Sequence, residues 1–277
     1  MRVAVYGVMR HLTYDQDWLD AILNYYDDAQ YVDLAAGLDK DADLIFWLHG
    51  LTAQEVYIPT WLADRRGKLV ILSGNDYKRL EEKRELYAKV GADLVGALAP
   101  NCPFENSAHI PHGLNPRLWG PGPVFTKRTR AIGFRGYRYP ESCGDTRNRF
   151  VELFMDGFDV KWEVFLNPTD YRDFLKSCRA TIATEAGAIG HKAISSRQFE
   201  AIGSKTALIM VEGEYSGCLT PEHYIAVKDD FSNVMDAIDR AMDPYEWRTV
   251  TNRALAHVLS HHTIDHRLKQ IEDMLWP

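Results

Sequence analysis

Two patterns of apolar and polar positions alternate along the chain. Short apolar runs bounded by glycine or polar residues predict buried strands, and stretches in which apolar residues recur every three or four positions predict helices. In the first part of the chain the strand-like runs are 2–7, 29–35, 41–50, 67–74, 92–100 and 107–113. Helical spacing occurs at 14–26 and 76–91. Strands that alternate with helices in this way indicate βαβ units and a parallel sheet.

The same alternation restarts at residue 130. The predicted strands are 130–136, 158–165, 179–187 and 206–213. The predicted helices are 145–157, 168–178, 195–203, 231–242, 244–262 and 263–275. The last helix is amphipathic, since Leu268, Ile271 and Leu275 share one face, and we expect it to pack back on the first half of the chain.

Residues 115–130 interrupt the alternation. This stretch is rich in proline and glycine, lacks periodicity and ends in basic residues, as linkers between domains often do. We therefore predict an α/β protein with two Rossmann-like domains facing a cleft. The first domain is expected at 1–118, the second at 119–260, and a C-terminal helix at 261–277.

Composition narrows the class of protein. A length of 277 residues suits one large domain or two ordinary ones, and 46% hydrophobic with 26% charged residues is typical of a well-packed globular chain. The formal net charge of -7 disfavours a dedicated nucleic-acid binder but is compatible with a local basic groove. The four cysteines are scattered without a CxxC pair, which argues against a zinc ribbon or a redox motif.

Segments that target proteins to membranes are not predicted. No apolar run approaches the roughly 20 residues of a membrane span. The start of the chain, MRVAVYGVMRHL, has too short an apolar run for a signal peptide and predicts a strand instead. We expect a cytoplasmic protein with free thiols, and the sequence indicates no particular oligomeric state.

The helix at 195–203, SSRQFEAIG, begins where ligands bind in open α/β sheets, at the carboxyl edge of the strands. Ser195 or Ser196 can cap this helix, and the free amides of its first turn suit an anion such as phosphate. Arg197 would add donors for phosphate oxygens. One turn further in, Glu200 can accept hydrogen bonds from a diol. The alternative is a capped helix with an exposed arginine and an exposed glutamate.

Four segments resemble a known family. They are PHGLNPRLW, AIGFRGYRYP, SSRQFEAIGSKTALI and HHTIDHRLKQIEDML, within about residues 110–275. The layout resembles a GT-B glycosyltransferase, and the second half is most similar to the CgeB/YkvP-type glycosyl-transferase-like family. The resemblance implies a nucleotide-diphosphate sugar on the second domain, with its sugar directed across the cleft to an acceptor held by the first.

The resemblance also implies roles for residues of the 195–203 helix. Glu200 falls where such enzymes place the glutamate that binds the ribose. Ser195, Ser196 and Arg197 fall near the diphosphate.

The first loop of the second domain contributes Gly136 and Arg138, where main-chain and basic groups of the family approach the diphosphate. The sequence departs from the family at Lys192, a position at which many retaining members have a second glutamate. Glu185 is the nearest carboxylate on the same edge and becomes a catalytic candidate. The departure leaves retention or inversion of stereochemistry open.

In the first domain, His49 ends a predicted strand and precedes Gly50, so it also falls on a carboxyl edge. A histidine there can hydrogen-bond a sugar or act as a general base. The alternative is a packed core histidine. His49, Arg197 and Glu185 form the set of catalytic candidates.

We predict no metal site and no cofactor besides the donor substrate. Asp41 and Asp43 form an Asp-x-Asp match that precedes a strand, on the edge away from ligands. Asp15 and Asp17 form a second match, better explained as first-turn acids of a helix. A group of histidines near the end of the chain recurs at helical spacing, and exposure to solvent is the simpler explanation for them: His257, His261, His262 and His266.

A basic cluster follows the linker. It could steer an anionic donor or acceptor, and a solvated surface is the alternative. Its members are Lys127, Arg128, Arg130, Arg135 and Arg138.

Together these features predict a metal-independent GT-B-like glycosyltransferase that moves a sugar from a nucleotide-diphosphate donor to an unidentified hydroxyl. Arg197, Arg138 and helix amides would stabilise the departing diphosphate. Three alternatives stay open. A nucleotide-sugar epimerase would convert the donor without an acceptor, and a non-catalytic binding or structural protein would bind nucleotide without turnover. A glycosyltransferase of modified DNA bases would use the basic cluster.

Overall fold

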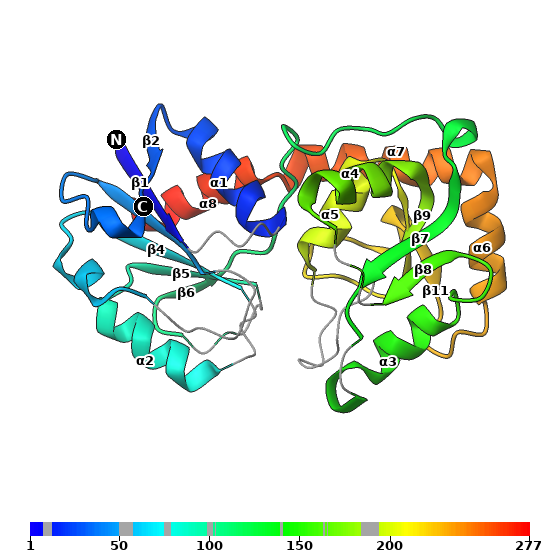
Figure 1. Cartoon of the computed structure of the whole chain (residues 1–277), viewed down its shortest axis with the longest axis horizontal. Helices are drawn as coiled ribbons and strands as arrows, with labels where there is room; N and C mark the ends of the chain where they lie inside the picture. Colours follow the sequence, from blue (N-terminus) through cyan, green and yellow to red (C-terminus); the bar gives the residue numbers. More distant parts are fainter. Residues whose placement is uncertain are drawn as a thin grey trace. The chain divides into compact units, whose positions relative to one another are not determined.

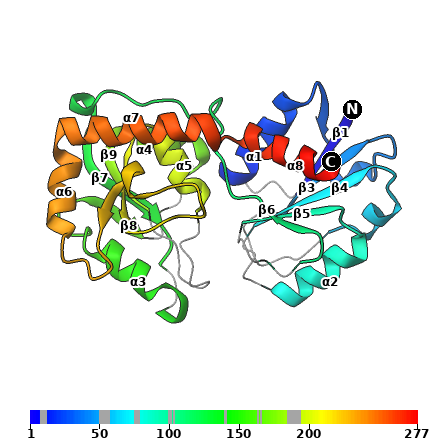
Figure 2. The ribbon, with the colours of Figure 1, turned by 180° about the vertical axis from the view of Figure 1, so that it is seen from behind.

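The computed structural model describes residues 1–7, 13–49, 58–74, 79–98, 102, 104–138, 141–162, 164, 166–183 and 194–277 (Figures 1 and 2). For residues 13, 14, 49 and 141–145 it describes the main chain only. The chain divides into two compact units. The first comprises Met1–Asn115 and Ile264–Pro277, and the second comprises Pro116–Thr263.

The first unit is built on a parallel sheet with the strand order β2-β1-β3-β4-β5-β6 (Figure 1). The strands are β1 (Arg2–Gly7), β2 (Asp28–Tyr31), β3 (Leu44–His49), β4 (Lys68–Ser73), β5 (Leu94–Ala97) and β6 (Ser107–His109). The helices are α1 (Thr13–Tyr25), α2 (Leu80–Val90) and α8 (Ile264–Leu275), with 3-10 turns η1 (Leu34–Ala36) and η2 (Thr60–Asp64).

Successive side chains of β3 enter the two hydrophobic layers of this unit. Leu44, Phe46 and Leu48 pack with residues of α1 and α8. Ile45 and Trp47 pack on the opposite face with residues of α2 and η2. Because β3 is covered on both faces, it forms a continuous apolar run, as central strands of parallel sheets do.

The second unit is built on a parallel sheet with the order β11-β10-β9-β7-β8. The strands are β7 (Arg130–Gly136), β8 (Asp159–Trp162), β9 (Cys178–Ile182), β10 (Ala207–Val211) and β11 (Ile225–Val227). The helices are α3 (Glu141–Glu152), α4 (Pro168–Ser177), α5 (Ser196–Gly203), α6 (Val234–Met242) and α7 (Pro244–His261), with 3-10 turns η3 (Phe125–Lys127) and η4 (Pro221–His223). Two parallel Rossmann-like sheets confirm the predicted α/β class.

One strand was missed, and the ends of several elements, including α3, differ from the predictions. The strand β11 was not predicted, because Ile225–Val227 is too short to display a pattern. The helix α3 begins at Glu141 rather than at residue 145, because its first turn lacks a helical apolar period in the sequence. Among the described residues, no helix has the length and apolar character needed to cross a membrane.

The solvated surface considered for the basic cluster is wrong for Arg128 and Arg135, which are 2% and 9% exposed. Arg128 donates hydrogen bonds to the carbonyls of Pro123, Cys178 and Ser204 at 2.9, 2.6 and 2.9 Å. Burial lowers the pKa of Arg128 to about 10. Arg128 therefore ties the proline-glycine stretch to the second unit, and this contact explains why a charged side chain is buried.

Candidate functional site

The start of α5 lies after β9 along the chain, toward the carboxyl edge of the second sheet. Ser195 is the N-cap residue and Ser196 is the first residue of the helix. The Gln198 side-chain oxygen accepts hydrogen bonds from the Ser195 main-chain nitrogen at 3.0 Å and from the Ser195 hydroxyl at 2.7 Å. This capping box fixes the direction in which α5 begins. The first amides of such a helix favour anions.

Two arginines from different helices lie over the Phe134 ring in β7. The guanidinium carbon of Arg197 in α5 is 4.9 Å from the ring centroid, and that of Arg147 in α3 is 5.7 Å from it. Arg197 Nη1 donates to the Arg135 carbonyl at 2.6 Å, and Arg147 Nη1 donates to the Tyr137 carbonyl at 2.5 Å. Both cationic groups are thus held at the carboxyl end of β7.

Gly136 lies between these two carbonyls, as the last residue of β7. A Cβ atom at this position would be 2.8 Å from Phe134 Cζ and 3.2 Å from Arg147 Nη2. The first distance is too short for a real contact, so any larger residue would displace the ring or the main chain. Glycine is required here by close packing.

Glu200 lies on the buried side of α5, one turn after its start. Its side chain is 2% exposed and Arg197 is half-buried, so the alternative of an exposed pair is wrong. Carboxylates are rarely buried this deeply in proteins unless they are paired or hydrogen-bonded. A carboxylate in this buried position is suited to accept hydrogen bonds from hydroxyl groups of a ligand.

Arg138, which was predicted for the same site as Gly136, forms an ion pair with the end of α3. Its Nη2 is 2.9 Å from Glu152 Oε1 at the end of α3. Its side chain is 55% exposed. The structure therefore brings Gly136, Arg197 and the start of α5 together, and it pairs Arg138 with Glu152.

The remaining predicted residues are only partly described. His49 is the last residue of β3 and pairs with Ser73 of β4, so its main chain lies at the carboxyl edge of the first sheet. The His49 side chain, Glu185 and Lys192 lie outside the described residues.

Arg147 is the site residue that sequence reasoning missed. It is 5% exposed and lies on the same face of α3 as two buried apolar residues, Phe150 and Val151. The sequence did contain a signal for Arg147, because this arginine falls among the core-facing positions of an amphipathic helix. Arginine is almost never fully buried without a specific partner, so such a position indicates a particular role. The Arg147 guanidinium also lies 5.5 Å from the Trp162 ring centroid.

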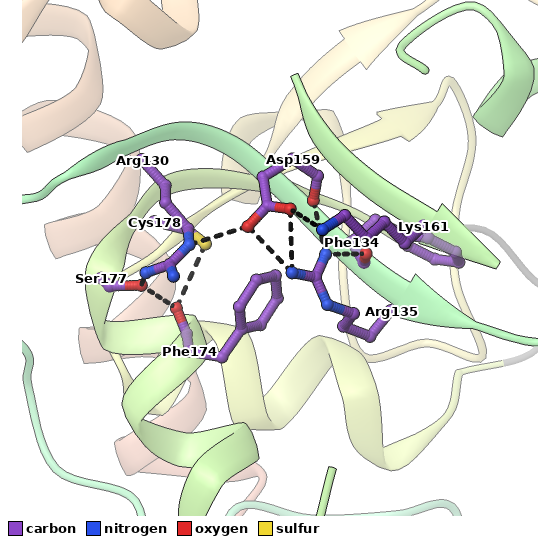
Figure 3. Close-up of polar contacts among 8 residues, drawn as sticks. All are labelled: Arg130, Phe134, Arg135, Asp159, Lys161, Phe174, Ser177 and Cys178. Carbon is purple, nitrogen blue, oxygen red and sulfur yellow. Dashed lines mark hydrogen bonds and ion pairs between the residues drawn. The ribbon is translucent and has the colours of Figure 1, made fainter. Parts of the chain in front are cut away.

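A salt-bridge cluster joins β7 to the start of β8 (Figure 3). Asp159 accepts hydrogen bonds from Arg135 Nη2 at 2.9 and 2.8 Å and from Arg130 Nε at 2.8 Å. Burial would raise the pKa of the Asp159 carboxyl, but the hydrogen bonds from both arginines outweigh it and hold the pKa below its usual value. The cluster anchors Arg135, whose carbonyl accepts the hydrogen bond from Arg197.

Within the described part of the chain, no group of three or more His, Cys, Asp or Glu side chains is placed to hold a metal ion. Asp43 accepts a hydrogen bond from the main-chain nitrogen of Arg2 at 2.8 Å. Asp15 and Asp17 are 1% and 5% exposed, within the first turns of α1.

Of the four C-terminal histidines, His261 and His266 are exposed, as predicted, whereas His257 and His262 are only partly exposed. The rings of His257 and His223 stack with centroids 4.1 Å apart, and His257 Nε2 is 2.9 Å from the Cys218 carbonyl. His266 lies in α8, in the other unit.

A family model described as glycosyl transferase-like matches residues 107–273, more than half of the chain. The chain belongs to this family. No curated protein sequence shows significant similarity to this glycosyl transferase-like protein.

Solved structures similar to this glycosyl transferase-like protein share its architecture. An alpha-glucosyltransferase in complex with UDP aligns with a TM-score of 0.70, 9% identity and 100% of both chains. An alpha-glucosyltransferase with UDP and a 13-mer DNA containing a HMU base aligns at 0.68, with 10% identity and 100% of both chains. The T4 phage BGT with UDP and Mn²⁺ aligns at 0.63, also with 10% identity and 100% of both chains. At such identities the likeness shows the fold, which is GT-B, and together with the family it makes the chain a glycosyltransferase.

Proposed function

We propose that this glycosyltransferase moves a sugar from a nucleotide-diphosphate donor to a hydroxyl acceptor without a metal ion. The observation that carries the proposal is the meeting of Arg147, Arg197 and Gly136 at the carboxyl end of β7. Similar structures solved with UDP make UDP sugars the first donors to test. The motifs in the second half also lead us to propose the CgeB/YkvP-type subgroup.

In this proposal the donor diphosphate lies against the two guanidiniums and the first turn of α5, beside Ser195 and Ser196. Planar guanidiniums suit phosphate oxygens because they offer several donors at once. Arg147 is buried and Arg197 half-buried, so their attraction for phosphate is screened less than at a surface. When the bond between sugar and phosphate breaks, negative charge grows on the diphosphate, and these donors stabilise it.

Glu200 is proposed to hold the ribose of the nucleotide. Two neighbouring hydroxyls can both donate to one carboxylate, and a hydrogen bond to a charged group is stronger than one between neutral groups. Because Glu200 lies one turn beyond the start of α5, one helix would position both the diphosphate and the ribose.

Catalytic roles for His49 and Glu185 remain proposals based on their place in the chain. His49 ends β3, and a ring nitrogen there could take the proton of the acceptor hydroxyl. Glu185 follows β9 and would act near the donor sugar. Arg138 would contact the diphosphate only after its ion pair with Glu152 opens.

The first experiment is calorimetry with uridine, UMP and UDP. Glu200→Gln should weaken all three by about tenfold or more, since a hydrogen bond to a charged group contributes roughly 1.5–3 kcal/mol. Arg197→Ala should weaken UDP binding more than uridine binding, because its partner is phosphate. A folded Glu200→Gln protein with unchanged affinity for all three ligands would show that the assignment is wrong.

Metal independence has its own test. It is proposed because Asp43 is engaged with Arg2 and the Asp15–Asp17 pair is buried at the start of α1. We expect turnover to survive EDTA. One similar structure contains Mn²⁺, so loss of turnover with EDTA and its recovery with Mg²⁺ or Mn²⁺ would refute this part of the proposal.

A hydroxyl on a modified DNA base is the acceptor with specific support, because one similar structure contains DNA with an HMU base. UDP-glucose should be incubated with and without such DNA and with free sugars. Transfer only in the presence of an acceptor is the expected result. Conversion of the donor alone would favour an epimerase, and tight binding without any conversion would favour a non-catalytic protein.

A further inference from the structure

The first unit contains an open surface hollow of about 510 Å³ at the amino-terminal edge of its sheet. It lies where η2 ends, β4 begins and α2 ends. The charged side chains that line it are Arg65, Arg66, Lys68, Lys89 and Asp93. Four cations therefore face one carboxylate, in a protein whose formal net charge is -7.

Asp93 is fully engaged inside the hollow. It accepts hydrogen bonds from Arg65 Nη2 at 2.9 Å, from Lys68 Nζ at 3.0 Å and from the Leu69 main-chain nitrogen at 2.9 Å. Burial would raise the pKa of Asp93, but these hydrogen bonds outweigh it and keep the pKa below its usual value. One ionised carboxylate is thus shared by two cations.

The Arg65 guanidinium is held by hydrogen bonds at the C-terminal end of α2. Its Nη1 donates to the carbonyls of Leu62 and Val90 at 3.0 and 2.7 Å, and its Nη2 donates to the Gly91 carbonyl. These bonds satisfy carbonyls at the end of the helix. They also place a fixed positive charge at the hollow without conformational cost on binding.

Arg66 and Lys89 are exposed, and neither makes an ion pair or hydrogen bond with any residue in the described ranges. The turn that carries Arg66 is tightly seated, because a Cβ on Gly67 would lie 2.2 Å from the Ala42 carbonyl oxygen. Two exposed cations therefore project from this turn and from the end of α2.

We propose that this hollow binds a small anion that carries two or more phosphate groups. Its lining is cationic rather than apolar, which favours an anionic ligand. Phosphate oxygens match both the arginine and the lysine donors. The site goes beyond the proposed transfer reaction, since none of its residues belongs to the unit that contains Arg147 and Arg197.

The test is a titration of the full-length protein with inorganic pyrophosphate, followed by amide NMR at Gly67 and Gly91. Both glycines line the hollow, so their resonances report this site even when pyrophosphate also binds elsewhere. We expect saturable shifts at both amides. The double variant Arg66→Ala/Lys89→Ala should weaken this binding by at least about tenfold, since two charged donors are lost.

The matched control is Lys40→Ala/Arg84→Ala, which removes two exposed cations of the same unit outside the hollow. It should leave the affinity unchanged. Absence of shifts at Gly67 and Gly91, or equal weakening by both double variants, would overturn the proposal. Shifts produced by duplex DNA but not by pyrophosphate would also overturn it, because the ligand would then be an extended polyanion.

Discussion

At the scale of single residues, Phe134 organises the candidate site. Its ring is 1% exposed and carries the guanidiniums of Arg147 and Arg197, which come from helices far apart in the sequence. Cation–π contacts of this kind contribute roughly 0.5–2 kcal/mol each. The ring thus sets where two positive charges lie before any ligand arrives.

Arg147→Lys tests this arrangement. Lysine keeps the charge but loses the flat group that stacks on Phe134 and donates to Tyr137. We expect about a tenfold loss of UDP affinity in calorimetry, with a smaller change for uridine. Arg149→Lys is the matched control, because Arg149 is exposed on the same helix two positions away. Equal losses in both variants would argue against a phosphate role for Arg147.

His112 makes stability depend on pH. Burial, with a smaller contribution from Arg267, lowers its pKa from 6.5 to about 3 in the folded protein. The unfolded chain therefore takes up the proton first as pH falls. The stabilisation from neutral His112 is complete above about pH 6.5 and is lost as the pH falls toward 3, by up to roughly 1.4 kcal/mol per pH unit.

The measurement is urea unfolding of the wild type and of His112→Gln between pH 7 and 4. The free energy of unfolding of the variant should be lower at pH 7 and should fall less steeply with acidification. Carboxylates titrate in both proteins, so the difference between the two curves isolates His112. Parallel curves would contradict the prediction.

At the scale of elements, α5 shows which serine does the capping. The sequence left Ser195 and Ser196 as alternatives, and the structure makes Ser195 the N-cap, with Gln198 completing the capping box. We expect Ser195→Ala to lower the free energy of unfolding by about 1 kcal/mol and Ser196→Ala to change it much less. Urea titration of both variants checks this, and a larger effect of Ser196→Ala would reverse the assignment.

The elements that the sequence predicted best are those with strong local patterns. The strand β7 was predicted with its observed bounds, because an apolar run between polar residues marks a buried strand without reference to the rest of the fold. The strand β11 was missed, since three residues at a sheet edge leave no pattern. Arg147 was missed for a different reason, because its partner Phe134 belongs to another element.

At the scale of the whole molecule, the C-terminal helix α8 belongs to the first unit, although it follows the second unit in the sequence. Ile264, Leu268 and Ile271 of α8 are at most 1% exposed and share one core with Trp18 and Ile22 of α1. The main-chain nitrogen of Ile264 also donates to the Leu114 carbonyl at 2.9 Å. The first unit is therefore built from both ends of the sequence.

Truncation after Thr263 should unfold the first unit and spare the second. Burial of each large apolar side chain contributes about 1.5–3 kcal/mol, so the loss of three approaches the whole stability of a typical domain. Hydrogen exchange followed by mass spectrometry should show lost protection in β1 and β3 and retained protection in β9 and β10. Removal of residues 276–277 alone is the control, and full protection of β1 after the longer truncation would contradict the expectation.

The sequence by itself determined the two α/β halves and the place of α5 between two strands, because buried strands and amphipathic helices leave periodic signals within a few residues. It also marked Arg197 and Glu200 as residues to examine, since they follow a strand on the edge where ligands bind. Only the tertiary structure decided which side chains meet. The approach of Arg147 to Phe134, the burial of Arg128 and the cationic hollow around Arg65 depend on contacts between distant segments, and such contacts have no local period to read.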